Sequence, residues 1–392
     1  MKQFETTRRG VLGGAAAIAA GSLGAGGRPA HAQAAMGINI IDAAGDLALT
    51  RTGFEAFGKA NPGRISRMTF TSSTAPEIPG KLRAQQDAGR VDIDIVLGGN
   101  DVLAAGIELK LWVPLMTEYA SKLPNLEVLN PLAAKLQTAA EGQALVVTVC
   151  PGGPILEYMP DRVKQVPGTA EELLAWCKAH PKKFMYARPA NSGPGRAFMM
   201  GLPYILGDTN PRDPIKGWDK TWAYLEEMSK SIEYYPTGTG AVMKEFGEGT
   251  RDMIASHVGW DINPRVLGVV PKEAEIATLK GFHWIGDSHF MCVPKGQTPE
   301  KMALILELVS FMMQPAQQAY TYDKGYFYPG PAVRDVPITM APKESQDAIR
   351  EFGRDSYAKL IADTPIELPL DAPGLVYAFR RWDEQVGAKV GK

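Results

Sequence analysis

The chain alternates short apolar runs with longer segments in which apolar residues recur at helical spacing. Residues 37–45, 65–70 and 91–97 have the length and composition of strands. Residues 47–60 between the first two carry Leu49, Phe54 and Phe57 on one helical face and end at Asn61-Pro62-Gly63. This order of strand and helix, joined by short turns, predicts an open and mostly parallel α/β sheet.

Two uncharged runs interrupt this alternation. Residues 145–150 (LVVTVC) stop at Pro151-Gly152-Gly153-Pro154, and residues 289–294 (HFMCVP) stop at Lys295-Gly296. Each run is typical of a strand that is buried on both faces. We interpret the runs as the two crossings between two α/β lobes, each an open sheet flanked by helices. Lobe 1 would hold residues 37–149 plus 290–392, lobe 2 residues 150–289, and the ligand cleft would lie between them.

The segment between the crossings repeats the alternation of strands and helices. Residues 183–187, 232–235 and 254–258 predict strands, and residues 171–180, 195–206, 218–230 and 241–248 predict helices. After the second crossing, residues 299–313 predict an amphipathic helix. Two further helices, at residues 346–361 and 372–386, are expected to pack back on lobe 1.

The first 32 residues have the features of an export signal. Arg8-Arg9 precede a stretch of Ala and Gly at residues 13–27, and Ala30-His31-Ala32 forms a small-residue cleavage site. The arginine pair and the glycine-rich stretch favour the twin-arginine route. The glycines also make this stretch too weakly apolar for a membrane-spanning helix. We therefore expect cleavage after Ala32 and a periplasmic protein.

Charge and cysteine content exclude several classes. The whole chain has a formal net charge of −1. Residues 1–32 contribute +3 (four basic residues, one acidic), so the mature chain is near −4 and has no basic block. Nucleic acid is therefore not an expected partner. Three cysteines do not make a multi-disulfide framework, although Cys150 and Cys292 in the two crossings would suit either a disulfide or two buried thiols.

Polar turns follow six of the predicted strands, three in each lobe. Ligands bind outside the carboxyl ends of strands in open α/β sheets, where helix N-termini present unpaired N–H groups. The same residue types also serve as ordinary helix caps. These turns and their flanks supply the ligand-binding candidates Gly45, Ser72, Ser73, Asn100, Asp101, Asn191, Ser192, Arg196, Thr237, Thr239, Trp260 and Asp261.

Two aromatic–acidic combinations indicate the charge of the ligand. Trp260-Asp261 and Trp284 with Asp287 would suit an organic cation, which a ring face and a carboxylate both attract. In the alternative interpretation, both tryptophans belong to the core and the acids cap helices. Arg196, at a predicted helix start, argues instead for a carboxylate or phosphonate ligand.

No catalytic motif is recognisable. The chain has no G-x-S-x-G and no H-E-x-x-H sequence. His283, Asp287 and His289 would share one face of an extended strand, but Gly286 favours a bend and only two histidines are available. We therefore expect no enzyme activity, no metal site and no cofactor.

Three segments carry a resemblance to a known family: residues 156–161 (LEYMPD), 247–253 (GEGTRDM) and 293–296 (VPKG) followed by the helix near 302–313. They resemble the periplasmic solute-binding proteins of ABC importers, in the type II branch that holds polyamine, thiamine and ferric-iron binders. The resemblance implies two lobes that close on a ligand and deliver it to a permease in the inner membrane. Iron binders of this branch carry a twin tyrosine where this chain has Trp260-Asp261, which disfavours iron. Polyamine binders place an aromatic and an acid as Trp284 and Asp287 stand here, although Gly286 changes the spacing by one residue.

These observations predict an exported, monomeric binding protein for a small organic solute. The solute would be a polyamine, a thiamine-like molecule or another amine. An anion binder on the same scaffold, a periplasmic enzyme and an interaction protein of the cell envelope are the alternatives.

Overall fold

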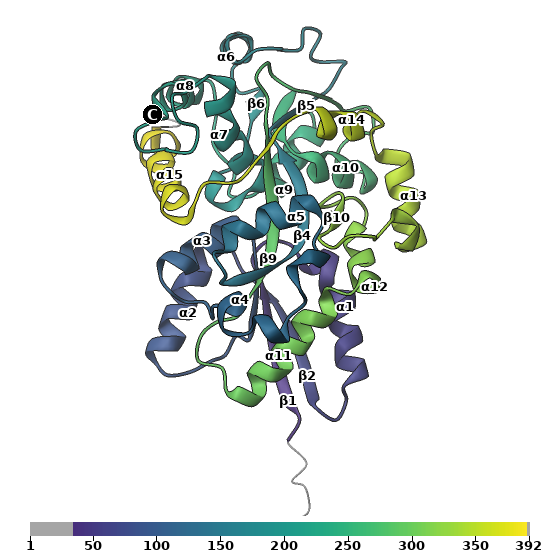
Figure 1. Cartoon of the computed structure of the whole chain (residues 1–392). Helices are drawn as coiled ribbons and strands as arrows, with labels where there is room; N and C mark the ends of the chain where they lie inside the picture. The colour runs from purple at the N-terminus through teal and green to yellow at the C-terminus, as the bar shows by residue number, and fades with distance from the viewer. Residues whose placement is uncertain (1–33, 390–392) are drawn as a thin grey trace, which may run out of the picture. The chain divides into compact units, whose positions relative to one another are not determined.

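A computed structural model describes residues 34–389 (Figure 1). The first sheet has seven strands in the order β10-β4-β9-β3-β1-β2, with β11 paired to β9. Within it, β1 (Met36–Asp42) pairs in parallel with β2 (Ile65–Ser72) and with β3 (Ile95–Gly98). These pairs are parallel as predicted, but β9 pairs antiparallel with β3 and β4, and β10 pairs antiparallel with β4, so the sheet is mixed rather than mostly parallel. β3 begins four residues later than predicted.

Both predicted crossings are buried strands that lie side by side (Figure 1). β4 (Ala144–Gly153) and β9 (Trp284–Cys292) pair antiparallel, and every residue of both strands is buried. The chain leaves the first sheet at the end of β4 and enters the second sheet at β5 (Ile155–Tyr158). β9 begins five residues before the predicted crossing, so Trp284 and Asp287 are part of this strand. Two short strands complete the first sheet, β10 (Gly330–Pro331) and β11 (Ile366–Glu367).

The second sheet has four strands in the order β6-β7-β5-β8. They are β5, β6 (Phe184–Met185), β7 (Met253–Ser256) and β8 (Glu275–Ala277). The predicted strand at residues 232–235 does not form. Its flanks make single backbone hydrogen bonds, from Lys182 N to Ser231 O (2.8 Å) and from Arg188 N to Pro236 O (3.0 Å), rather than a ladder.

Helices cover both sheets. One hydrophobic cluster packs the first sheet against residues of α1 and α11, and another joins residues of α6, α7 and α8 to the second sheet. The α-helices are α1 (Leu47–Ala60), α2 (Ile78–Asp87), α3 (Asn100–Glu108), α4 (Leu115–Glu118), α5 (Pro131–Gln137), α6 (Ala170–Ala179), α7 (Gly193–Ile205), α8 (Asp219–Ser229), α9 (Thr239–Gly247), α10 (Val258–Val266), α11 (Pro299–Met312), α12 (Pro315–Gln318), α13 (Lys343–Phe352), α14 (Ser356–Asp363) and α15 (Ala372–Gln385).

The last helix meets the expectation in part, because α15 packs on α3 beside the first sheet and also on helices of the second sheet. α15 lies beside the helices of the second sheet, where Trp382 donates its Nε1 hydrogen to Tyr186 Oη (3.2 Å) and meets the Tyr235 ring edge to face (Figure 1). α15 carries a buried apolar stripe, which completes the core around α7 and α8. It also contacts α3 of the first sheet. The proposed boundaries of the two lobes stay a prediction.

The predicted export signal lies outside the described residues. Among residues 34–389, no helix is long and apolar enough to cross a membrane. Cys150 and Cys292 are free buried thiols and form no disulfide.

Candidate functional site

A pocket of about 200 Å³ lies where elements of the two sheets meet. The loops after β1 and β3 line it from the first sheet, and the starts of α7, α9 and α10 line it from the second. Strand β9 contributes Asp287 and His289. The structure thereby brings together eight of the predicted residues: Gly45, Asp101, Asn191, Ser192, Arg196, Thr239, Trp260 and Asp287.

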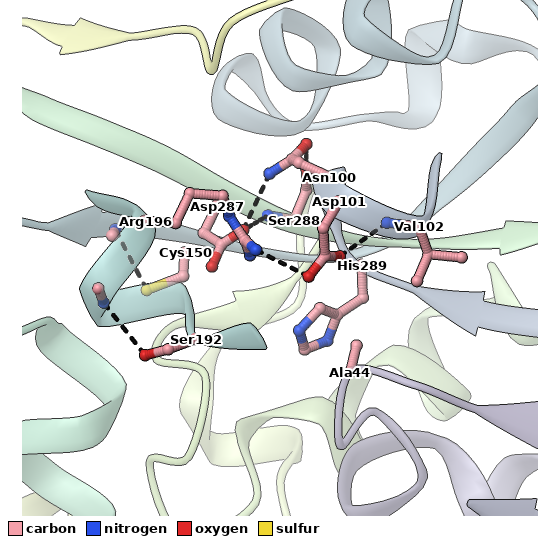
Figure 2. A network of polar contacts seen from close by, with 12 residues as sticks. Ala44, Asn100, Asp101, Val102, Cys150, Ser192, Arg196, Asp287, Ser288 and His289 are labelled. Atoms are coloured by element: carbon pink, nitrogen blue, oxygen red, sulfur yellow. Dashed lines mark hydrogen bonds and ion pairs between the residues drawn. The ribbon is translucent and has the colours of Figure 1, made fainter. Parts of the chain in front are cut away.

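Arg196 links the two sheets at the pocket (Figure 2). Its Nη1 donates to Asp101 Oδ2 (2.8 Å) and its Nη2 to Asp287 Oδ1 (3.5 Å). The arginine is 5% exposed. Burial alone would lower its pKa, but the two carboxylates outweigh this effect and raise the pKa above its ordinary value. One guanidinium therefore serves two carboxylates.

The two oxygens of Asp287 differ in their surroundings. Oδ1 accepts hydrogen bonds from Asn100 Nδ2 (2.9 Å) and from Ser288 N (3.0 Å) in addition to Arg196. Oδ2 accepts none from residues 34–389. A Cβ added at Gly193 would lie 2.8 Å from Oδ2 and 3.1 Å from His257 Nε2, so the glycine lets the start of α7 approach this oxygen closely. Burial alone would raise the pKa of Asp287, but the charges of Arg196 and the nearby histidines outweigh this effect and lower the pKa below its ordinary value.

Two histidines form another part of the pocket wall. His289 Nδ1 lies 2.8 Å from Asp46 Oδ1, and its ring stacks on Phe327 with centroids 4.0 Å apart. Burial would lower the pKa of His289, but the hydrogen bond and charge of Asp46 raise it overall. Burial lowers the pKa of His257 to about 4, so its imidazole is neutral at pH 7. The Nδ1 atom of His257 has no hydrogen-bond partner among the described residues.

Aromatic rings supply an apolar wall. Trp260 near the start of α10 meets Tyr326 edge to face, with centroids 5.4 Å apart, and both residues line the pocket. On another side, Ser192 Oγ lies 2.8 Å from Thr239 Oγ1 and accepts from Gly195 N (3.1 Å). These contacts tie the start of α7 to the start of α9.

Several predicted site residues lie elsewhere. Asp261 and Trp284 are both fully buried. Asp261 is bound by Arg265, Arg354 and Tyr357. Residues 260–263 belong to α10 rather than to a turn, and successive helical side chains point about 100° apart. Trp260 consequently reaches the pocket and Asp261 does not. The Trp284 ring lies in the core, where Nε1 donates to Leu360 O (3.3 Å).

The remaining candidates lie outside the pocket lining or support a pocket residue indirectly. Ser72 ends β2 and Ser73 follows it; β2 is the edge strand farthest from β9, and neither serine lines the pocket. Asn100 donates a hydrogen bond from Nδ2 to Asp287 Oδ1. The Thr237 carbonyl oxygen accepts a hydrogen bond from Asn191 Nδ2. His283 pairs with Glu367 (3.0 Å) rather than with His289. No group of three His, Cys, Asp or Glu side chains in residues 34–389 is placed to hold a metal ion.

Sequence reasoning did not assign His257, His289, Tyr326 or Phe327 to the solute pocket. The shared strand parity of Asp287 and His289 is a signal that could have found His289. Tyr326 and Phe327 come from an irregular segment between η6 (Ala319–Tyr322) and β10, which carries no periodic pattern.

Comparison with known families gives one clear match. The family described as bacterial extracellular solute-binding protein matches residues 53–348, about three quarters of the chain. A comparison with curated protein sequences finds no match.

Solved structures share the fold at low sequence identity. The spermidine/putrescine substrate-binding protein PotD of Streptococcus pneumoniae is 13% identical, with a TM-score of 0.62 over 90% of this chain and 98% of that chain. The binding protein AfuA of Actinobacillus pleuropneumoniae, with fructose-6-phosphate bound, is 14% identical, with a TM-score of 0.60 over 89% and 98%. The ferric binding protein of Campylobacter jejuni is 14% identical, with a TM-score of 0.62 over 89% and 99%. The predicted two-lobed type II binding fold is thus confirmed, whereas the three ligands differ in charge.

Proposed function

Because the chain belongs to the bacterial extracellular solute-binding protein family, we propose that it captures a small organic cation in the pocket around Arg196 and Asp287. It then delivers the solute to an ABC permease in the inner membrane. The predicted export signal supports a periplasmic location.

The main observation in favour of a cationic solute is the unpaired carboxylate oxygen of Asp287. Asp287 Oδ2 has no hydrogen-bond partner among the described residues, and Asp287 lines the pocket together with Gly193. Arg196 balances only one of the two carboxylates that it contacts, so one negative charge remains. Trp260 and Tyr326 line the same pocket, and an aromatic face attracts a cation by about 0.5–2 kcal/mol. An ammonium group on Oδ2 with its apolar part against these rings satisfies both features.

Ligand contacts with both sheets would drive closure. Asp287 lies on β9 of the first sheet, and Trp260 lies in α10 after the second. A solute that touches both groups binds the closed arrangement more tightly than an open one and shifts the population toward it.

A second candidate is an anionic solute. The starts of α9 and α10 reach the pocket and neither has a side-chain cap, so their N–H groups suit an anion. AfuA with its fructose-6-phosphate supports this candidate on the same fold. The engagement of Arg196 by two carboxylates weighs against it.

Calorimetry with amines and phosphonates on the purified mature protein separates the candidates. We expect Asp287→Asn to weaken amine binding by at least about tenfold, because a hydrogen bond to a charged group contributes about 1.5–3 kcal/mol. Asp383→Asn is the matched control, since Asp383 is half-exposed and pairs with Arg188 outside the pocket. Phosphonate binding that Asp287→Asn leaves unchanged or strengthens, without any amine binding, would contradict the cation proposal.

The export route has its own test. Replacing Arg8 and Arg9 together by lysine should block transport through the twin-arginine route and leave the precursor in the cytoplasm. Cell fractionation and immunoblotting would measure this. Wild-type levels of the double variant in the periplasm would show that another route is used.

A further inference from the structure

The cluster of Asp101, Asp287 and Arg196 at the pocket carries one net negative charge. Asp101 and Asp287 contribute −2 and Arg196 contributes +1. His289 and Asp46 form a pair that sums to zero when the imidazole is protonated. Asp42, at the end of β1, is occupied by backbone N–H groups at the start of α1, including those of Ala44 and Leu47 at 2.9 Å.

We propose that Arg196 is a built-in counter-cation that limits the solute to a single positive charge. This inference rests on the proposed function, because it concerns which cation the same pocket accepts. Arg196 would thus be a specificity-determining residue.

The geometry leaves one place for an ammonium group. Both oxygens of Asp101 are engaged, Oδ2 by Arg196 (2.8 Å) and Oδ1 by Val102 N (2.8 Å). Among the described residues, Asp287 Oδ2 is therefore the unpaired oxygen of the two carboxylates. A second ammonium would have to displace the guanidinium or lie beside it, and like charges in a buried site repel strongly.

The Arg196 guanidinium also occupies space at the pocket. The cavity is about 200 Å³, and Arg196 fills the region between Asp101 and Asp287 (Figure 2). Trp260 and Tyr326 line the part of the wall that an apolar body would contact.

Two probes of equal chain length test the charge limit: pentylamine, with one positive charge, and 1,5-diaminopentane, with two. We expect calorimetry to show that the wild-type protein prefers pentylamine by at least about tenfold, because the second ammonium of the diamine would be repelled by the buried Arg196 guanidinium. An apolar pocket alone would give the same preference, so variants are required.

Three variants change the pocket charge in defined steps. Arg196→Gln gives −2, and the preference should reverse toward the diamine. Asp101→Asn gives 0, and both probes should bind more weakly. The double variant Arg196→Gln/Asp101→Asn returns the charge to −1, and the preference for pentylamine should return. Arg188→Gln is the matched control, because this exposed arginine lies outside the pocket and should leave the preference unchanged.

The outcomes separate the two proposals. Amine binding in which the wild type prefers the diamine, or in which the double variant loses the preference for pentylamine, would overturn the charge limit and leave the cation proposal standing. Binding of propylphosphonate without binding of either amine would overturn the proposed function itself. Circular dichroism and thermal melts establish that each variant is folded. If Arg196→Gln does not fold, Arg196→Met provides the same pocket charge of −2, and a preference that does not shift toward the diamine in this variant would overturn the charge limit.

Discussion

Stability should depend on pH through His257. The ordinary pKa of histidine is 6.5, and burial lowers the pKa of His257 to about 4 in the folded protein. Between these two values the unfolded chain binds a proton that the folded protein does not. The free energy of unfolding therefore falls as the pH falls through this window. Above pH 6.5, both states are deprotonated and His257 contributes no pH dependence.

The magnitude follows from the difference between the two pKa values. They differ by about 2.5, and each pKa unit corresponds to about 1.4 kcal/mol. His257 should thus cost about 2–3 kcal/mol of stability between pH 7 and pH 4.5. This is a large part of the total stability of a typical domain, which is about 5–15 kcal/mol.

Urea unfolding at a series of pH values would measure the effect. Carboxylates that are paired in the folded protein, such as Asp287, also weaken the fold as the pH falls. The informative quantity is therefore the difference between the wild type and His257→Gln in how much the free energy of unfolding falls between pH 7 and pH 4.5. The variant has no titrating group at this position, so its stability should fall by about 2–3 kcal/mol less over the same range. Equal acid dependence in the two proteins would refute the burial argument.

Three other changes test the packing and the pocket. Gly193→Ala places a Cβ 2.8 Å from Asp287 Oδ2 and should weaken amine binding at least about tenfold in calorimetry without loss of fold; unchanged affinity would show that the ammonium lies elsewhere. Arg354→Met leaves buried Asp261 without its bidentate partner and should lower the unfolding free energy by about 3–5 kcal/mol in urea, so an effect below about 1 kcal/mol would count against a tight pair. Trp382→Ala should cost about 3–5 kcal/mol through the cavity that it opens, and a thermal melt identical to that of the wild type would refute the role of α15 in the core.

Local pattern predicted most of the strands and several of the residues that line the pocket. Charge-free runs identify β4 and β9 because both strands are buried on both faces. The rule that ligands bind at the carboxyl ends of strands places Gly45, Asp101 and Thr239 at one pocket, since these ends converge.

The start of α10 shows where pattern misleads. Gly259 and Pro264 predict a turn, yet both lie inside the helix. Gly259 instead allows the Tyr326 backbone to pack closely against α10, because a Cβ at this position would lie 2.0 Å from the Tyr326 carbonyl oxygen. The need for this glycine comes from a segment about seventy positions away, which periodicity along the chain does not report.

The partners of buried charged residues could not be predicted from the sequence either. Arg196 and Asp101 are 95 positions apart in sequence, and Arg354 and Asp261 are 93 apart. Composition indicates that a buried charge needs a partner but does not say which one. The same ambiguity made Asp261 a candidate for the ligand site, although arginines from α10 and from the segment after α13 neutralise it.

The position of α15 affects how the chain can fold while it is being made. Trp382 completes a core whose Tyr186 is 196 positions earlier in the sequence. A growing chain emerges from the ribosome N-terminal end first, so this core remains open until synthesis is nearly finished. All residues that line the pocket precede residue 328. A nascent or prematurely ended chain can therefore contain the complete set of pocket residues while its aromatic core is exposed to chaperones and proteases.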